Sequence, residues 1–547
     1  MSIHLSRKTD KKIDTKADET NKKIEEVKEE IIENIRQVYA PGRPSVSDYF
    51  DGYPKLPNEK IQETLELGLK FREKQKYDAA VSTFRSLINL KPTNDQLIAI
   101  FSLIGSTQYL QEDYPSAKKS YGDALDLATT MQNKVAISAV TGNLGILYSL
   151  TGESDKALEY LNKALEISHY IGYKNAEADQ LGNIGAIYIE KGELDKALGC
   201  FNKALEIYHN IGDVIGEANQ LGNFGILYKN KGEFDKALMY QNKALEMHRK
   251  IGSQLGEASD LSNIGAIYSM KGDMNQALEY HEKALQIHRL LKNKFGESHD
   301  LGNIGVLFWG NGEPDRAMEY FSKSMEIDRQ LGYKLGEAHS LANIGLVYKD
   351  TGNEHNALKF FNEALEIHRQ LGDKFAEADD LSNMGLVYWQ KKDLNKALEF
   401  FNTALEIAST SGHKMAEARI LGNIGIIYRD KNETDKALEY FNKSLEMDRK
   451  IGNKFDEATS LGNIGTIYMD RNDLEKALKY QTMALQMHRQ VGFKFGEAND
   501  MSNIGKIYNM KGDTKEALKS LEKALEIFRE IKAEHKVREL EKVISSV

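Results

Sequence analysis

An asparagine recurs every 40 residues along most of the chain, and its side chain is well suited to recognising another protein. The amide offers both a hydrogen-bond donor and an acceptor, which match the C=O and N–H groups of a peptide backbone. A row of such amides could therefore hold an extended chain by its backbone. The ten members of this asparagine ladder are Asn143, Asn183, Asn223, Asn263, Asn303, Asn343, Asn383, Asn423, Asn463 and Asn503.

The residues beside the ladder vary between copies and would give a bound chain its sequence preference. Six residues after an asparagine stand the only two tryptophans, Trp309 and Trp389, and among the cations at this position we single out Lys349 and Arg429. Exposed tryptophans would anchor ligand side chains, whereas tryptophans that pack on the next unit would not, and the sequence leaves both open. Acidic residues recur nearby and predict negative patches and a ligand with basic side chains. They are Asp260, Asp300, Asp350, Asp380, Asp430, Asp470 and Asp500.

The ladder also has a purely structural interpretation. Each asparagine could bond to the adjacent unit and fix how the units stack. Asparagine is a mediocre helix former and leucine would pack better, so ten copies require a reason, and both interpretations provide one. We favour ligand contact as the working hypothesis.

Catalytic, metal and cofactor sites are not predicted. Four histidines share one position of the second helix in different units, so each pair is at least a whole unit apart, which is too far for one metal ion. They are His248, His288, His368 and His488. The sequence lacks the G-x-x-x-x-G-K-[ST], G-x-G-x-x-G and H-E-x-x-H motifs. Carboxylate pairs such as 379–380 suggest surface positions with no pocket to raise a pKa. We therefore expect no enzyme activity, no metal and no cofactor.

Composition narrows the choice of partner and compartment. The net charge is −9, and the 73 basic and 82 acidic residues are dispersed, which disfavours nucleic acid as a partner. A single cysteine, Cys200, excludes an intramolecular disulfide and fits a reducing compartment. The start of the chain is polar and no apolar run is long enough to span a membrane, so no membrane partner is expected and the cytoplasm is the default location.

Two helices must position each asparagine. In the unit 173–212, apolar residues at steps of three and four follow a first helix through Tyr188, and a second apolar face begins at Leu194. Gly212 is expected to end the second helix in a left-handed conformation. Asp213 is placed to cap the next helix.

A glycine stands two residues after every asparagine, in the middle of the first helix. Glycine there costs up to about 1 kcal/mol relative to alanine, so ten copies indicate that no side chain fits. For Gly185 we expect the second helix of the unit to cross at this point, with Ala197 and Ala204 as the opposing small residues.

The spacing of small and aromatic residues resembles the tetratricopeptide-repeat signature. The residues that carry it are Gly185, Tyr188, Gly192, Ala197, Phe201 and Ala204. The 40-residue period and the Leu-Gly-Asn tripeptide, as at 181–183, are similar to a subgroup that includes the Leu-Gly-Asn-repeat spindle-orientation adaptor, kinesin light chains and bacterial peptide-pheromone sensors. The resemblance implies an all-α, right-handed superhelical solenoid of about twelve helix-turn-helix repeats. It also implies that the ladder faces a concave groove and holds an extended peptide.

The function implied is a non-catalytic scaffold or adaptor that binds a protein or peptide partner in extended conformation. One alternative is a peptide-sensing signalling regulator, although residues 1–60 are short and proline-interrupted for the output module that such sensors carry. The other alternative is a structural protein that self-assembles through a coiled coil.

The domain organisation follows from changes in composition. Residues 1–39 form a charged segment with an apolar stripe, predicted as a helix and a possible coiled coil, which could make a homo-oligomer through residues 10–38. Residues 40–60 hold four of the seven prolines and are predicted as a linker. The solenoid is expected over 61–537, with a first repeat near 61–97 and then one every 40 residues from 98. A C-terminal capping helix is expected over 533–547.

Overall fold

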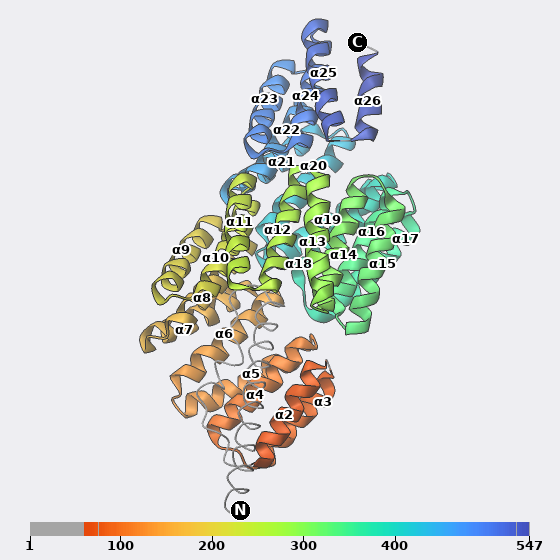
Figure 1. Cartoon of the computed structure of the whole chain (residues 1–547). Helices are drawn as coiled ribbons and strands as arrows, with labels where there is room; N and C mark the ends of the chain where they lie inside the picture. Colours follow the sequence, from red (N-terminus) through yellow and green to blue (C-terminus); the bar gives the residue numbers. More distant parts are fainter. Residues whose placement is uncertain (1–58, 75, 532, 546–547) are drawn as a thin grey trace, which may run out of the picture.

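The computed structural model describes residues 59–74, 76–531 and 533–545, and these ranges hold 25 α-helices and no strand. The helices form twelve successive helix-turn-helix units, followed by the single helix α26 (Figure 1). The predicted all-α solenoid of about twelve repeats is confirmed. The expectations for residues 1–39, including a homo-oligomer through 10–38, and for the linker up to residue 58 lie outside the described residues.

In each unit the even-numbered helix is helix A and the odd-numbered helix is helix B. The bounds are α2 (Glu59–Glu73), α3 (Tyr77–Ile88), α4 (Asn94–Leu110), α5 (Tyr114–Thr130), α6 (Lys134–Leu150), α7 (Ser154–Ile171), α8 (Lys174–Glu190), α9 (Leu194–Ile211), α10 (Val214–Asn230), α11 (Phe234–Ile251), α12 (Gln254–Lys271), α13 (Met274–Leu290), α14 (Lys294–Gly310), α15 (Pro314–Leu331), α16 (Lys334–Asp350), α17 (Glu354–Leu371), α18 (Lys374–Gln390), α19 (Leu394–Ser411), α20 (Lys414–Asp430), α21 (Thr434–Ile451), α22 (Lys454–Asp470), α23 (Leu474–Val491), α24 (Lys494–Met510), α25 (Thr514–Glu530) and α26 (Glu534–Ile544). We call the connection inside a unit the A–B loop and the connection between units the B–A loop.

Local sequence explains where the helices end. Gly212 follows α9 with φ of 73°, the left-handed conformation in which glycine has no steric penalty. The Asp213 carboxylate accepts a hydrogen bond from the backbone N–H of Gly216 and so caps α10. Both predictions for this loop are confirmed.

The glycine in the middle of helix A marks a close approach of helix B, as predicted, but the opposing residue is different. A Cβ on Gly185 would lie 2.3 Å from Cε1 of Phe201. The expectation of Ala197 and Ala204 as the opposing residues is therefore wrong. Phe201 lies between them on the same face of α9, and its ring fills the space against the backbone of α8, while both alanines are fully buried beside it.

Helix A of each unit lies on the inner side of the curved stack. Besides packing on its own helix B and on helix B of the preceding unit, helix A contacts the A helices of adjacent units, as α10 contacts both α8 and α12. Elements on the concave side of a curved array approach one another most closely. The A helices therefore line the concave face.

The solenoid winds back on itself after eleven helices. The backbone N–H of Leu335, at the start of α16, donates to Oε2 of Glu112 in the α4–α5 loop over 3.1 Å, although the two residues are 223 positions apart. The N–H of Lys454 donates to the carbonyl oxygen of Lys231 over 3.3 Å. Each bond joins an A–B loop to the B–A loop eleven helices further on. We call α2–α12 the first coil, and we call these links inter-coil contacts.

Apolar side chains strengthen the inter-coil contacts. The rings of Phe234 and Phe455 meet edge to face with centroids 6.3 Å apart. Ile451 is buried in one cluster with Ile189 and Leu194 of the first coil. Successive coils of the solenoid are therefore packed against each other rather than separated by solvent.

Candidate functional site

The ten asparagines of the ladder all lie on A helices, from α6 to α24, on the concave side of the solenoid. Asn183 and Asn223 are buried, and the other eight are half-buried. The structure thus places every ladder asparagine on a helix of the concave side, and three of them line one cavity.

Several ladder asparagines make long hydrogen bonds. The Asn303 amide donates to Nδ1 of His299 on its own helix over 3.3 Å. The Asn223 amide donates to Oε1 of Gln220 on its own helix over 3.3 Å. The Asn423 amide reaches Oγ of Ser382 in the preceding unit at 3.5 Å. Within the described part of the chain, the side chains of Asn343 and Asn383 make no hydrogen bond. The amides are therefore not uniformly committed to holding neighbouring units together.

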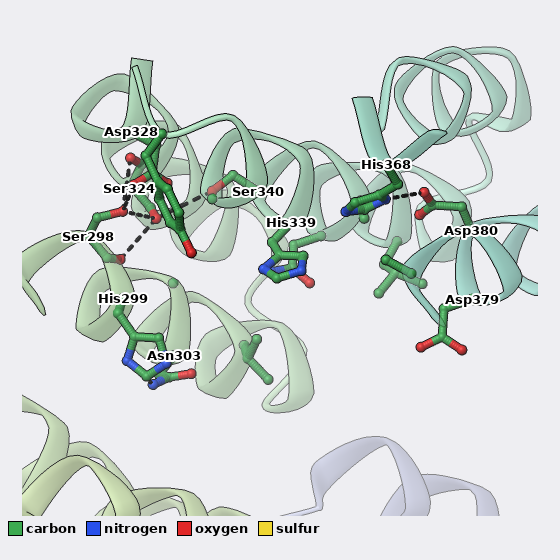
Figure 2. A pocket seen from close by; sticks show the side chains of 18 of the residues that line it. Ser298, His299, Asn303, Ser324, Asp328, His339, Ser340, His368, Asp379 and Asp380 are labelled. Atoms are coloured by element: carbon green, nitrogen blue, oxygen red, sulfur yellow. Dashed lines mark hydrogen bonds and ion pairs between the residues drawn. The ribbon is translucent and has the colours of Figure 1, made fainter. Parts of the chain in front are cut away.

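A cavity of about 370 Å³ opens on the concave face over α14, α16 and α18. Three successive members of the ladder line it, Asn303, Asn343 and Asn383. Val306 and Leu346, each three residues after an asparagine, contribute apolar surface. His299, His339 and Asp379 also line this space and are labelled in Figure 2.

A buried polar network forms one wall of the cavity (Figure 2). Oγ of Ser298 donates to Oδ1 of Asp328 over 2.6 Å. Oγ of Ser324 donates to the carbonyl oxygen of Ser298 over 2.9 Å, and Ser340 bonds to Ser324. Burial raises the pKa of Asp328 to about 6, although the bond from Ser298 opposes the shift. The Asp328 carboxyl gives this wall a buried hydrogen-bond acceptor.

Buried histidine–aspartate pairs join consecutive units. In each pair a histidine on helix B meets, through Nδ1, an aspartate on helix A of the next unit. The pairs are His248–Asp260 at 2.6 Å, His288–Asp300 at 2.7 Å, His368–Asp380 at 2.7 Å and His488–Asp500 at 2.6 Å. Burial raises the pKa of Asp260 to about 6, while the bond to His248 acts in the opposite direction.

These pairs correct two expectations from the sequence. Asp260, Asp300, Asp380 and Asp500 were expected to form exposed negative patches and are instead buried. The residue three before each asparagine points at helix B of the preceding unit, because that helix packs on this side of helix A. The 379–380 carboxylates are therefore not a surface pair, and burial raises the pKa of Asp380.

Residue types at this unit interface vary in a correlated way. Where helix B carries Asp448 instead of histidine, the residue twelve positions on is Ser460, whose Oγ donates to Asp448 over 2.7 Å. Where it carries Ala408, the partner position is Ile420, and both side chains are fully buried. This pairing of positions twelve apart was present in the sequence and is the signal by which the buried aspartates could have been found.

The repeats match a known protein family. A family profile described as tetratricopeptide repeat matches residues 96–169, 177–250, 217–289, 256–330, 299–370, 335–410, 377–450 and 456–530. The chain belongs to the tetratricopeptide-repeat family. No curated protein matches the sequence.

Several solved structures resemble this tetratricopeptide-repeat (TPR) chain at low identity. BtubC (BKLC) from P. vanneervenii is 20% identical, with a TM-score of 0.36 over 40% of this chain and 92% of that one. A Rap protein complexed with competence and sporulation factor is 16% identical, with a TM-score of 0.47 over 65% of this chain and 99% of that one. The apo form of RapI is 18% identical, with a TM-score of 0.39 over 50% and 98%.

The tryptophans of the TPR array bond to the following unit. Nε1 of Trp309 donates to Oδ2 of Asp350 over 2.8 Å. In the same geometry, Trp389 donates to Asp430 over 2.7 Å. Both tryptophans are half-buried, so each packs on its neighbour and keeps part of its surface exposed.

Lys349 and Arg429, the two cations predicted to contact the ligand, are also paired. Nζ of Lys349 lies 3.1 Å from Oδ1 of Asp350. Nε of Arg429 donates to Oδ2 of Asp470 in the next TPR unit over 2.5 Å. The carboxylates of Asp350, Asp430 and Asp470 thus bond to neighbouring cations or indoles, which reduces the negative potential expected for the groove.

Neither a metal cluster nor a membrane span is found in the described parts of this TPR chain. No three of their histidine, cysteine, aspartate and glutamate side chains are grouped so as to hold a metal ion. None of the described helices combines the length and hydropathy needed to cross a bilayer.

Proposed function

We propose that this TPR protein is a non-catalytic interaction scaffold that binds an extended segment of a partner protein along its concave face. The observation that carries the proposal is that Asn303, Asn343 and Asn383 open into one cavity of about 370 Å³. Neighbouring helices pack about 8–10 Å apart and an extended chain advances about 3.3 Å per residue. Successive asparagines would therefore contact roughly every third residue of the ligand.

The chemistry of the cavity supports a ligand held mainly by its backbone. The carboxamides of Asn343 and Asn383 make no hydrogen bond within the described residues and match backbone N–H and C=O groups. Val306 and Leu346 offer an apolar surface to one ligand side chain. The carboxyl of Asp328 lines the cavity and accepts hydrogen bonds, which favours a ligand group that donates one, such as a lysine, arginine or amide side chain.

The rest of the ladder and its neighbours would extend the contact. The partly exposed faces of Trp309 and Trp389 would bind apolar ligand side chains on either side of the cavity. Lys349 and Arg429 lie at the same register, and their pairing with aspartates holds them in place. Sequence preference would come from these variable positions.

The test compares two triple variants in affinity capture from lysate, with captured proteins identified by mass spectrometry. The groove variant carries Asn303→Ala, Asn343→Ala and Asn383→Ala. The control variant carries Asn242→Ala, Asn362→Ala and Asn442→Ala on exposed faces of B helices, where each amide bonds only to its own helix backbone. Loss of three hydrogen bonds worth about 1 kcal/mol each predicts affinity lower by about 100-fold for the groove variant.

The result is decided by the difference between the two variants. Circular dichroism must show that both remain folded. The proposal predicts partners that the wild type and the control capture and the groove variant loses. A folded groove variant that captures the same partners at the same level would show that the ladder only fixes stacking.

A further inference from the structure

A salt bridge recurs between helix B of one unit and helix A of the next. An arginine in the last turn of helix B donates through Nε to Oε1 of the glutamate eight residues later, over 2.6–3.0 Å. The six pairs are Arg249–Glu257, Arg289–Glu297, Arg329–Glu337, Arg369–Glu377, Arg449–Glu457 and Arg489–Glu497. At two earlier interfaces a histidine takes the place of the arginine. A cation at this position is therefore a regular part of the interface.

The interface between α19 and α20 lacks this cation. Ser409 occupies the arginine position, and Glu417 occupies the position of the glutamate. Oε2 of Glu417 accepts a hydrogen bond from Lys414 over 2.7 Å, as Oε2 of Glu337 does from Lys334. Oε1, the atom that an arginine contacts at the other interfaces, makes no hydrogen bond within the described residues. The glutamate thus keeps one of its two usual partners, although its side chain is only 14% exposed.

A cavity of about 330 Å³ opens beside Ser409, between the B helices α19 and α21. It lies apart from the concave face, because its walls come from the two B helices and the N-terminal half of α20 and include no asparagine of the ladder. Three apolar side chains form part of the wall: Leu405, Leu421 and Met447. Glu417 lines the same space. A carboxylate and an apolar surface therefore face one cavity.

An interface that has its arginine shows which group fits this cavity. At α23–α24, Arg489 donates through Nε to Glu497, and its Nη2 lies 3.6 Å from Sδ of Met501. Met501 is 80 residues after Leu421 and occupies the equivalent position, as Glu497 does for Glu417. The guanidinium of Arg489 therefore fills the space that is a cavity between Glu417 and Leu421.

The lysines of α21 that border the cavity are paired along their own helix. Nζ of Lys443 lies 2.7 Å from Oε1 of Glu439, and Nζ of Lys450 lies 2.7 Å from Oε1 of Glu446. Within the described residues, Glu417 has Lys414 as its one cationic partner. Its carboxylate can therefore accept a second charge-assisted hydrogen bond.

We infer that this cavity binds the side chain of an arginine supplied by a partner protein. We call it the arginine site, formed by Leu405, Ser409, Glu417, Leu421 and Met447. The guanidinium donates to Oε1 of Glu417, and the methylene groups of the arginine pack on the apolar wall. Arginine suits this contact because its planar group is weakly hydrated and pairs directionally with carboxylates. The arginine site is separate from the asparagine ladder and does not depend on the function proposed for it.

The experiment follows the methionine methyl signals of the full-length protein by NMR while N-acetyl-L-arginine amide is added. Met447 lies in the wall of the arginine site and reports on it. Met487 is the internal control, because it holds the equivalent position at an interface that contains Arg449. The variants Met447→Leu and Met487→Leu assign the two signals. N-acetyl-L-citrulline amide, which has nearly the same shape without the charge, is the control ligand.

Three substitutions separate the arginine site from a general effect of the ligand. Ser409→Arg supplies the residue that other interfaces contain, so it keeps the fold and occupies the cavity. Thr410→Arg adds the same charge one residue further on, at an exposed position outside the cavity wall. Glu417→Gln removes the charge of the acceptor and preserves its shape.

The Met447 signal is expected to shift and to saturate at millimolar arginine amide, while the Met487 signal stays in place. The dissociation constant should rise at least about 10-fold in Glu417→Gln. The shift should disappear in Ser409→Arg and persist in Thr410→Arg.

Four results would overturn the inference. These are a Met447 signal that does not shift, an equal shift with the citrulline compound, a Ser409→Arg variant that still responds, and equal shifts of Met447 and Met487.

Discussion

Replacing His368 with alanine should destabilise the interface between α17 and α18. His368 is the hydrogen-bond partner of the buried Asp380, at 2.7 Å. Without the imidazole the carboxyl must take up a proton or remain charged in a dry environment, and burial already raises its pKa. Breaking a buried pair in this way costs roughly 3–5 kcal/mol, and we expect about 3 kcal/mol because protonation limits the penalty.

The next interface along the array contains a residue pair that should restore the lost stability. Ala408 and Ile420 occupy the same two positions there, and both are fully buried. Ala416 belongs to the same buried cluster as Ala408 and Ile420, and the residue at the equivalent position of the His368 interface is Ala376. The double variant His368→Ala and Asp380→Ile thus recreates a pairing that the fold already contains. It should recover stability to within about 1 kcal/mol of the wild type.

Thermal melting compares the overall stability of the variants. Amide hydrogen exchange of peptides from α17 and α18 measures the local effect, because a repeat unit unfolds together with its neighbours. The single variant should accelerate exchange in these helices, and the double variant should restore protection. If the double variant loses as much stability as the sum of His368→Ala and Asp380→Ile measured separately, the two kinds of interface are not interchangeable and the reasoning fails.

Two further substitutions test packing and burial. Gly185→Ala should destabilise the protein by about 1–2 kcal/mol in urea unfolding, because crowding against Phe201 outweighs the gain in helix propensity. Gly182→Ala meets only Gln220, at 3.4 Å, and should stabilise by up to about 1 kcal/mol, so equal effects would contradict the packing argument. Burial raises the pKa of Asp448 to about 7, above its unfolded value, so the folded protein retains a proton that the unfolded chain has released. The stability that this group contributes is full at low pH and is lost as pH rises through 7. Relative to Asp448→Asn, the wild type should lose up to about 3 kcal/mol between pH 5 and 8 in thermal melts, and parallel pH profiles would contradict this.

Features that depend on short-range geometry could be predicted from the sequence. Gly212 and Asp213 identified a helix end and a cap because backbone conformation and capping are decided by one or two residues. The ladder positions were also identified, since a period without insertions puts equivalent residues on equivalent faces. Their role as ligand contacts stays a prediction.

Features that depend on which neighbour a side chain meets were harder to predict. Ala197 and Ala204 were expected opposite Gly185 because they are small, but the flat ring of Phe201 also fits against a glycine backbone. The aspartates at 260 and 380 were expected at the surface because charged residues usually lie there, whereas the histidine twelve residues earlier allows them to be buried. The inter-coil contacts had no signal in the unit itself, because they depend on a small rotation per unit summed over eleven helices.

The packing of one coil on the next has a kinetic consequence for any guest on the inner surface. Bonds such as Glu112 to Leu335 and Lys231 to Lys454 join adjacent coils along the side of the solenoid and obstruct entry from that side. A linear guest must then thread in from an end, or wait until the coils part. Entry and escape both cross that barrier, so association would be slow and a captured chain would have a long residence time even where each individual contact is weak.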